Sequence, residues 1–400
     1  MLFTFVILFL TLGCDLAYGQ GEEGNEKEEV TVTLDFSKEG AFGLKNNTSQ
    51  SVLTNITFKV QDLSVSLTGY TCHYIGTNKY LRLDYDANHP GQLQISVPKP
   101  IVIDSITMRT TKGIFIKYKN KFLSATEKKP IVESINSNNL TLTESKKTGE
   151  SLSSFITSIT LTYTRPKLDA TLDEKAFDAE CTIKGIVGEN KTLALNRTFN
   201  PSQLYTMCLP FDLSKKMITE IFGNKTQVYS YDGYQNGELS FSTVKEDLVK
   251  AGMPFLMRSE YYVEQPTFAD VTVRSTTAQT VCGGEWDLCG TFGSYELAAD
   301  GTQLFLTAGG TLAKPLADSR KMRGFRCYLQ KAAGTANASA QLPSVTIDGE
   351  TNAIKIAEYA APTSATTAYS LSGMKLNAGC KTANGGIMII DGKKFITTNR

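Results

Sequence analysis

Apolar and polar residues alternate along most of the chain from Val30 onward. In Val30–Phe36 every second side chain is apolar, which is the period of a strand with one buried face. Many short segments of this kind, separated by turn-forming residues, predict an all-β protein of tandem β-sandwiches with jelly-roll or immunoglobulin-like topology. The other strands expected in the first domain are Leu53–Val60, Leu63–Leu67, Lys79–Tyr85, Gln92–Val97, Ser105–Met108, Ile114–Tyr118, Leu140–Thr143 and Ile156–Tyr163.

Turn and linker residues divide this pattern into domains. The turn signal Asn88-His89-Pro90-Gly91 predicts a hairpin over residues 79–97. The first domain is expected at 30–164, with Arg165-Pro166 as the linker, because proline breaks strand pairing and restricts the residue before it. The second domain is expected at 167–331, followed by a linker of small residues at 332–341 and a small β tail at 342–400.

Two short helices are expected in the second domain. Ser214 can cap a helix over Lys215–Phe222, which Gly223 ends. Thr243-Val244-Lys245-Glu246 has the form of a capping box and predicts a second helix that ends before Gly252. In the tail, Asp391-Gly392 predicts a tight hairpin within residues 385–398, packed on a strand at 368–371 or on the second domain.

The N-terminus has the anatomy of a secretory signal peptide. Met1–Leu12 is an uncharged apolar run, and Ala17-x-Gly19 offers a small-x-small cleavage site that leaves Gln20 first. Leu12-Gly13-Cys14 also resembles a bacterial lipobox, which would leave Cys14 lipidated and the protein associated with the outer membrane. We therefore expect a leader at 1–19, an acidic spacer at 20–29 and an exported chain, at the cell surface or outside the cell. No later apolar run is long enough to span a membrane.

Composition narrows the chemistry. The formal net charge of +1 argues against nucleic acid as a partner of the whole chain. Only His73 and His89 are available for a Ser-His-Asp triad or a histidine-rich zinc site. No stretch of the sequence has a catalytic signature, so no residue is assigned a catalytic role and no cofactor is expected beyond the calcium ion considered next.

Two groups of residues are candidates for binding. Trp286, between Glu285 and Asp287, has the composition of a sugar-stacking platform, although its alternation with Leu288 favours a core position. A second aromatic candidate consists of Tyr229, Tyr231 and Tyr234. The oxygen-bearing side chains of Asp84, Asp86 and Asn88 have the spacing of a calcium loop, and the alternative is a solvated turn.

Several motifs resemble known families. Thr198-Phe199, YTMCLPFD at 205–212, AGMPFLM at 251–257 and MRGFRCY at 322–328 resemble a module of secreted and surface proteins of Bacteroidetes bacteria. AYSLSGM at 368–374 and GIMIIDGKK at 386–394 are similar to the small β-sandwich that serves as a sorting tail in type IX secretion. The resemblance implies an exported, surface-located protein and names no reaction.

These observations together predict an exported, non-catalytic binding or adhesion protein directed at a glycan or a host surface. A structural or assembly component of the cell envelope is the alternative. A glycoside hydrolase, or an accessory module of one, is the third interpretation, since a pair of carboxylates at catalytic separation is a spatial feature that sequence does not reveal.

Overall fold

The chain folds as an all-β protein with several sheets, as the alternation predicts. The computed structural model describes residues 26–46, 52–74, 79–112, 116–119, 121–123, 131–145, 153–201, 203–306, 312–316, 320–333 and 342–351, and short tail strands within 368–396. The chain divides into one compact unit at 1–355 and a second at 356–400. The predicted leader, with Cys14, lies outside the described residues. No helix in the described segments is long and apolar enough to cross a membrane.

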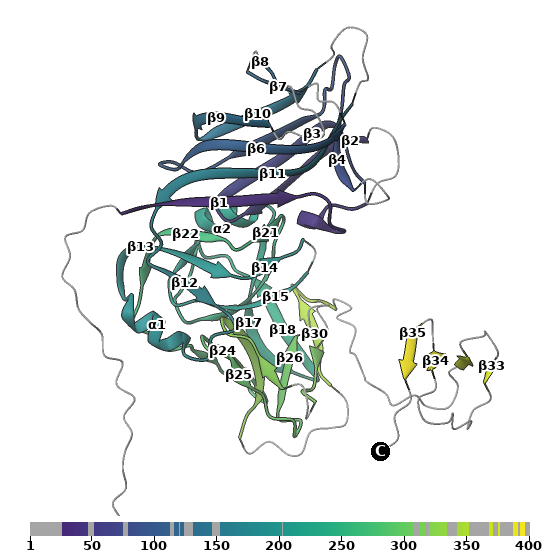
Figure 1. Ribbon diagram of the computed structural model, residues 1–400. Helices are drawn as coiled ribbons and strands as arrows, with labels where there is room; N and C mark the ends of the chain where they lie inside the picture. Colours follow the sequence, from purple (N-terminus) through teal and green to yellow (C-terminus); the bar gives the residue numbers. More distant parts are fainter. Residues whose placement is uncertain are drawn as a thin grey trace, which may run out of the picture. The chain divides into compact units, whose positions relative to one another are not determined.

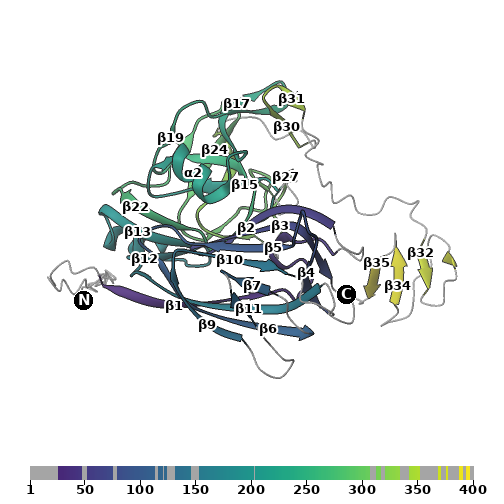
Figure 2. The same cartoon turned by 90° about the horizontal axis from the view of Figure 1, so that it is seen from above.

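The N-terminal region, residues 26–166, is a two-layered β structure (Figure 1). Its hydrogen-bonded path runs β8-β7-β10-β5-β3-β4-β11-β6-β9, with β1 on β11 and β2 on β3. From above, Figure 2 separates the layer of β2, β3 and β5 from the layer of β1, β6 and β9. The strands are β1 (Lys27–Asp35), β2 (Val52–Val60), β3 (Leu63–Tyr74), β4 (Tyr80–Asp84), β5 (Gln92–Ser96), β6 (Val102–Lys112), β7 (Ile116–Tyr118), β8 (Lys121–Phe122), β9 (Ile131–Ser137), β10 (Asn139–Glu144) and β11 (Ser153–Pro166).

The alternating apolar residues fill the space between these layers. Leu34 on β1, Ile159 and Leu161 on β11, and Leu63 and Val65 on β3 are fully buried in one cluster. Each belongs to an apolar series of period two, so a shift of one residue in any strand would turn that series to the solvent. The strands expected from the pattern are therefore confirmed, with β8 and β9 as additions.

The predicted hairpin over residues 79–97 is wrong. β4 and β5 do not pair with each other; both pair with β3, β5 along residues 64–68 and β4 along 71–74. The turn after β4 crosses β3 at Gly69, which has φ +74°, and the Tyr70 N–H donates to the His89 carbonyl oxygen (3.1 Å). A Cβ at Gly69 would lie 2.1 Å from the Pro90 carbonyl oxygen, so this crossing requires glycine.

The predicted linker at Arg165-Pro166 is also wrong, because both residues belong to β11. β1 pairs with this end of β11, with Lys27 opposite Pro166, so residues 27–29 of the predicted spacer are strand as well. The Arg165 side chain is buried between Glu28 and Asp62, at 2.7 and 2.6 Å. Charge pairing thus extends the strand through a segment whose proline and glutamates resemble a linker.

The sheet of the N-terminal region continues into the central region, residues 167–351. β21 pairs in parallel with β2, and β14 pairs with β21. The central strands are β12 (Ala170–Asp173), β13 (Gly188–Asn196), β14 (Thr198–Phe199), β15 (Tyr205–Cys208), β16 (Leu213–Ser214), β17 (Gln227–Gln235), β18 (Glu238–Thr243), β19 (Leu248–Val249), β20 (Pro254–Arg258), β21 (Tyr262–Glu264), β22 (Thr267–Val273), β23 (Thr280–Val281), β24 (Trp286–Thr291), β25 (Tyr295–Glu296), β26 (Gln303–Leu306), β27 (Leu312–Ala313), β28 (Lys321–Met322), β29 (Arg326–Lys331), β30 (Ser344–Ile347) and β31 (Glu350–Thr351).

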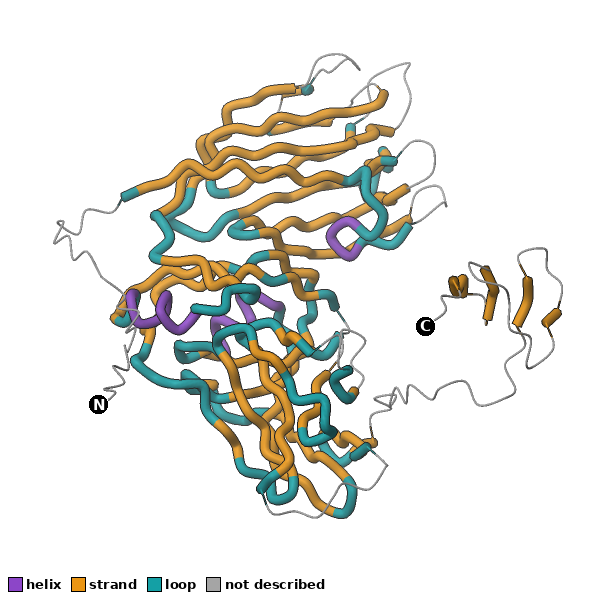
Figure 3. The backbone as a smooth tube through the Cα atoms, turned by 60° about the horizontal axis from the view of Figure 1, so that its bottom comes forward, coloured by secondary structure: helices purple, strands orange, loops and turns teal. Residues whose placement is uncertain are grey.

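Three sheets form most of the central region. Their orders are β12-β13-β22, β15-β20-β17-β18-β30-β31 and β23-β24-β29-β26-β27. Two buried clusters fill the interior, one rich in phenylalanine around Phe199, Phe222 and Phe268, the other around Trp286, Tyr231 and Leu329. Figure 3 shows how little of the backbone is helical among the strands.

One of the two predicted helices is confirmed. α2 spans Lys215–Phe222, the Met217 N–H donates to the Ser214 hydroxyl (3.2 Å), and Gly223 follows with φ 106°. The second predicted helix is wrong, because residues 244–247 are not helical. The Thr243 N–H, which a capping box would direct to the Glu246 side chain, donates to the Asp348 carboxylate instead (2.7 Å), and the Thr243 hydroxyl donates to the same carboxylate (2.8 Å). The other α-helix among the described residues is α1 (Ala179–Gly185), which the apolar pattern did not indicate.

The predicted tail begins later than residue 342. β30 pairs in parallel with β18, which places residues 344–347 in the central sheet, and the boundary between the two compact units follows Lys355. The second unit contains β32 (Ala368–Ser370), β33 (Lys375–Leu376), β34 (Ile387–Ile390) and β35 (Lys393–Ile396). β34 and β35 pair as the predicted hairpin, and β34 pairs with β32 as expected.

Candidate functional site

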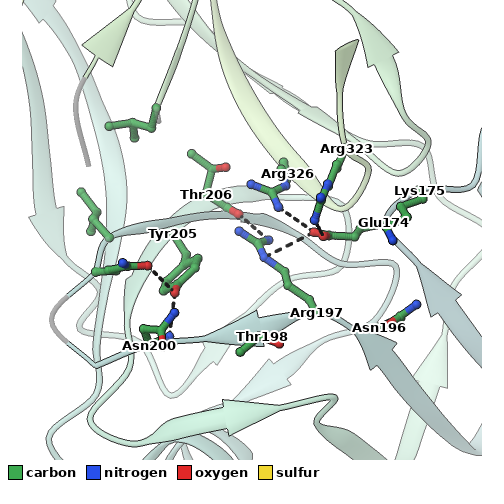
Figure 4. A pocket seen from close by; sticks show the side chains of 13 residues that line it. Glu174, Lys175, Asn196, Arg197, Thr198, Asn200, Tyr205, Thr206, Arg323 and Arg326 are labelled. Carbon is green, nitrogen blue, oxygen red and sulfur yellow. Dashed lines mark hydrogen bonds and ion pairs between the residues drawn. The ribbon is translucent and has the colours of Figure 1, made fainter. Parts of the chain in front are cut away.

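A cavity of about 320 Å³ in the central region contains an unusual number of arginines (Figure 4). Its buried floor includes Glu174 and Arg197, whose side chains are only 4% and 2% exposed. Arg326 is partly covered, and Arg323 and Lys175 reach the exposed rim. The cavity therefore opens directly beside charged groups that are almost completely covered.

The register of two strands places Glu174 beside Arg197. β12 and β13 run parallel, with Asp173 opposite Asn196. Glu174 and Arg197 directly follow these two residues and therefore also lie side by side. The Gly324 N–H donates to the Glu174 carbonyl oxygen (2.6 Å), which holds the segment before β29 against this end of β12. A Cβ at Gly324 would lie 2.2 Å from the Phe292 carbonyl oxygen, so the close packing of this segment on the backbone of Phe292 requires glycine. Glycine thereby lets Arg323 and Arg326 reach Glu174.

Arg197 is anchored on one side only. Its Nη1 donates to the carbonyl oxygens of Thr206 (2.9 Å) and Phe325 (3.4 Å), and its guanidinium lies over the Phe199 and Tyr205 rings. Its Nε and Nη2 are buried and have no hydrogen-bond partner among the described residues. Glu174 Oε2 is 3.7 Å from Nε, an ion-pair distance too long for a hydrogen bond.

Negative charge is scarce in this cluster. Glu174 Oε1 accepts from Arg323 and Oε2 accepts from Arg326 Nη2 (2.6 Å), so one carboxylate faces three guanidiniums. Burial alone would raise the pKa of Glu174, but Arg326, Arg323 and Arg197 outweigh it and lower that pKa below its usual value. Burial, and then the like charge of Arg326, lowers the pKa of Arg197. The cluster therefore favours an additional anion.

Neutral hydrogen-bonding groups complete the lining. Asn196 and Thr198 are exposed at the rim, and Asn200 and Gln203 are half-buried. The Tyr205 hydroxyl donates to Gln203 Oε1 (2.8 Å) and accepts from the backbone N–H of Asn200 (2.6 Å), which fixes the ring beneath this wall. Amide and hydroxyl side chains both donate and accept, as recognition of a polyhydroxylated molecule requires.

The aromatic candidates lie in the core and not on a surface platform. Trp286, Tyr229 and Tyr231 are 3%, 3% and 6% exposed, and the Tyr231 hydroxyl donates to the Trp286 carbonyl oxygen (2.7 Å). Tyr234 is partly buried and packs against the same cluster. A stacking platform needs an exposed ring face, so this prediction is corrected: the fold brings three of these rings together, as packing.

The two acids beside Trp286 are also engaged locally. Glu285 forms an ion pair with Lys331 (Oε1 to Nζ 3.5 Å), and Asp287 accepts a hydrogen bond from the Gly283 N–H (2.9 Å). Their carboxylates hold the β23–β24 turn and the end of β29. Trp286, which stands between them in the sequence, is buried in the core.

The calcium candidates do not converge. The Asp84 carboxylate is buried against Arg82 and Ser153, while Asp86 Oδ1 accepts from the backbone N–H groups of Asn88 (2.9 Å) and His89 (2.7 Å). Asn88 is exposed. Within the described residues no group of three or more His, Cys, Asp or Glu side chains has the arrangement of a metal site. The spacing therefore reflects a capped turn.

Sequence reasoning missed the arginine cavity. Its only local signal is Arg323-Gly324-Phe325-Arg326, in which a glycine and a phenylalanine separate two arginines. Glu174 and Arg197 lie more than a hundred residues earlier, and only the folded chain brings them to that motif, through strand register, backbone hydrogen bonding and the ion pairs themselves.

Comparisons of the chain with protein-family models, with curated proteins and with solved structures found no match.

Proposed function

We propose that this protein is an exported, non-catalytic binding protein whose arginine cavity holds the acidic group of a carbohydrate. One observation carries the proposal: Arg197 Nε and Nη2 and Arg326 Nε are buried, without hydrogen-bond partners among the described residues, beside a cavity large enough for a ligand. Burying charged donors without acceptors costs free energy, and an anion in the cavity offsets that cost.

The charge balance supports an anion over a neutral ligand. Three arginines and Lys175 line the cavity, against the single carboxylate of Glu174. Guanidinium groups bind carboxylate, sulfate and phosphate oxygens through charge-assisted hydrogen bonds, which are stronger than neutral ones. Glu174 already accepts hydrogen bonds from Arg323 and Arg326, which orients these two arginines, while Arg197 meets it only at an ion-pair distance of 3.7 Å.

The remaining lining supports a sugar as the carrier of that anion. The cavity volume falls near the lower end of the range for small-molecule sites, about 300–1,000 Å³. Asn196, Asn200, Gln203 and Thr198 present amide and hydroxyl groups around the charged floor. A uronic acid or a sulfated sugar combines one anionic group with a ring of hydroxyls, and this lining fits both features.

Isothermal titration calorimetry with the full-length protein tests the proposal. The probes are D-galacturonate, D-glucuronate, N-acetylneuraminate and galactose 6-sulfate, with D-galactose and D-glucose as neutral controls. At least one acid is expected to bind, and its neutral parent is expected to bind at least tenfold more weakly. If no acid binds in low salt, the proposal is wrong.

A matched pair of variants locates the binding. Arg323→Gln removes an exposed arginine of the cavity, and we expect it to weaken binding of the acid about tenfold, in line with a lost charge-assisted hydrogen bond. Arg274→Gln removes an exposed arginine that pairs with Asp212 (2.8 Å) outside the cavity, and it should leave the affinity unchanged. Equal losses in both variants would show a general charge effect.

The location of the protein belongs to the same proposal. The apolar N-terminal run supports export, and the similarity of residues 368–374 and 386–394 to a type IX sorting tail supports delivery to the cell surface. Fractionation of cells that produce the full chain tests this, and confinement to the cytoplasm would contradict it.

A further inference from the structure

We infer that the ligand is an oligosaccharide, with its acidic unit in the arginine cavity and a neighbouring ring stacked on Phe177. This inference rests on the proposed function and names the ligand more closely. Its starting observation is that the Phe177 side chain is 83% exposed, more than any other large hydrophobic residue among those described. An exposed aromatic ring presents the kind of apolar face on which the apolar face of a sugar ring stacks.

Phe177 lies within reach of the cavity. Lys175, which lines the cavity, is two residues earlier, so the two Cα atoms are at most about 7 Å apart. Glu174, on the cavity floor, precedes Lys175 directly. A saccharide that leaves the cavity past Lys175 therefore reaches the segment that carries Phe177.

The backbone around Phe177 is fixed from several sides. The Ala176 N–H donates to the Asp173 carbonyl oxygen (3.1 Å), and the Ala176 carbonyl oxygen accepts from the Ser294 N–H (3.0 Å). Gly293 packs so closely that a Cβ there would lie 2.8 Å from the Phe177 carbonyl oxygen. Ala179, at the start of α1, is buried. The ring is thus exposed on a well-anchored segment, where stacking costs little additional ordering.

The same short segments connect the ring to the arginines. Gly293 and Ser294 precede β25, which pairs with β28, and Arg323 follows β28 directly. Gly324 then bonds to Glu174. Phe177 and the charged groups therefore belong to one cluster of loops, which makes a shared ligand consistent with their placement.

Calorimetry with two matched pairs of probes tests the inference on the full-length protein. The pairs are D-galacturonate with trigalacturonate, and D-glucuronate with a hyaluronan tetrasaccharide. The oligosaccharide of at least one pair is expected to bind about tenfold or more tightly than its monosaccharide. Phe177→Ala is expected to remove that gain and leave the monosaccharide affinity unchanged. Phe122→Ala, which removes an exposed phenylalanine of the N-terminal region, should change neither.

The outcomes separate the two proposals. Oligosaccharides that bind no better than monosaccharides, or an undiminished gain in Phe177→Ala, would overturn the role of Phe177 and leave the acidic site intact. Failure of every acid, monomer or oligomer, would overturn the proposed function itself. Sedimentation velocity gives a further check: if Phe177→Ala converts a dimer to a monomer, the ring is a contact between copies of this chain and the inference is wrong.

Discussion

Glu144 is a carboxyl group held in the core of the N-terminal region, where only 1% of the residue is exposed. Burial raises its pKa to about 8; the Ser154 hydroxyl partly offsets this rise, and the charge of Asp84 adds to it. Between pH 4.5 and 8 the folded protein therefore keeps a proton that the unfolded chain releases. The free energy of unfolding must fall as the pH rises through this range, by about 1.4 kcal/mol per pH unit from this group alone.

Glu144→Gln should remove that dependence, because the amide mimics the protonated acid. We expect similar unfolding free energies for wild type and variant near pH 5, and a variant more stable by roughly 3–4 kcal/mol at pH 8. Urea denaturation at a series of pH values measures this. Glu39→Gln, at an exposed glutamate, is the control and should follow the wild type. Parallel curves for wild type and Glu144→Gln would refute the protonated-core assignment.

The sequence does not indicate the cavity residues, because their role depends on contacts between distant segments. A buried arginine gives the same local pattern as an arginine that ends a strand, and Arg197 directly follows β13. Its significance comes from Glu174 and Arg326, which reach it through parallel register and a close glycine contact. Trp286 shows the converse: its flanking acids resemble a sugar site, but its alternation with Leu288 correctly indicated a buried position.

The cap of α2 is the clearest local determinant among the elements. The Ser214 hydroxyl accepts the Met217 N–H, which satisfies one of the free amides of the first turn. Ser214→Ala should therefore lower the free energy of unfolding by about 1 kcal/mol, whereas Ser214→Asp, which keeps an acceptor, should remain close to wild type. Chemical denaturation measures both, and an alanine variant as stable as the aspartate variant would contradict the capping role.

Elements governed by nearby residues were predictable, and those governed by distant ones were not. Strand positions and α2 follow from alternation and a local cap. The false helix after Thr243 has an equally good local signal, but Asp348, more than a hundred residues away, takes both of its donors. In the same way, the residues between β4 and β5 are typical of a hairpin turn, yet both strands pair with β3. β5 pairs with β3 before Gly69, and β4 pairs with it after Gly69.

At the scale of the whole molecule, the divisions suggested by composition do not match the pairing of strands. Arg165 and Pro166 lie in β11, and β21 of the central region pairs with β2 of the N-terminal region. Prolines, glutamates and small residues have a weak propensity for regular secondary structure. Strand pairing and buried ion pairs can override that propensity. Only the boundary after Lys355 separates compact units.

Two truncations distinguish the predicted boundary at 331 from the observed one at 355. A chain ending at Lys355 retains β30, with Val345 and Ile347 each 4% exposed in the core beside Trp286, and it retains the bonds from Thr243 to Asp348. We expect it to unfold at the same temperature as the first unit of the full chain. A chain ending at Lys331 loses that strand and should be destabilised by about 3–6 kcal/mol, because two core side chains lose their burial at about 1.5–3 kcal/mol each.

Differential scanning calorimetry of both truncated proteins and the full chain measures this difference. Val345→Ala in the full chain is a milder companion and should lower the unfolding temperature without removing β30. Since β18 pairs with β30 along Glu238–Phe241, hydrogen exchange at those amides should accelerate in the shorter truncation and stay slow in the longer one. If both truncations unfold like the full chain, residues 344–347 add nothing to the stability of the central sheet, and the boundary at 331 is the better division of the molecule.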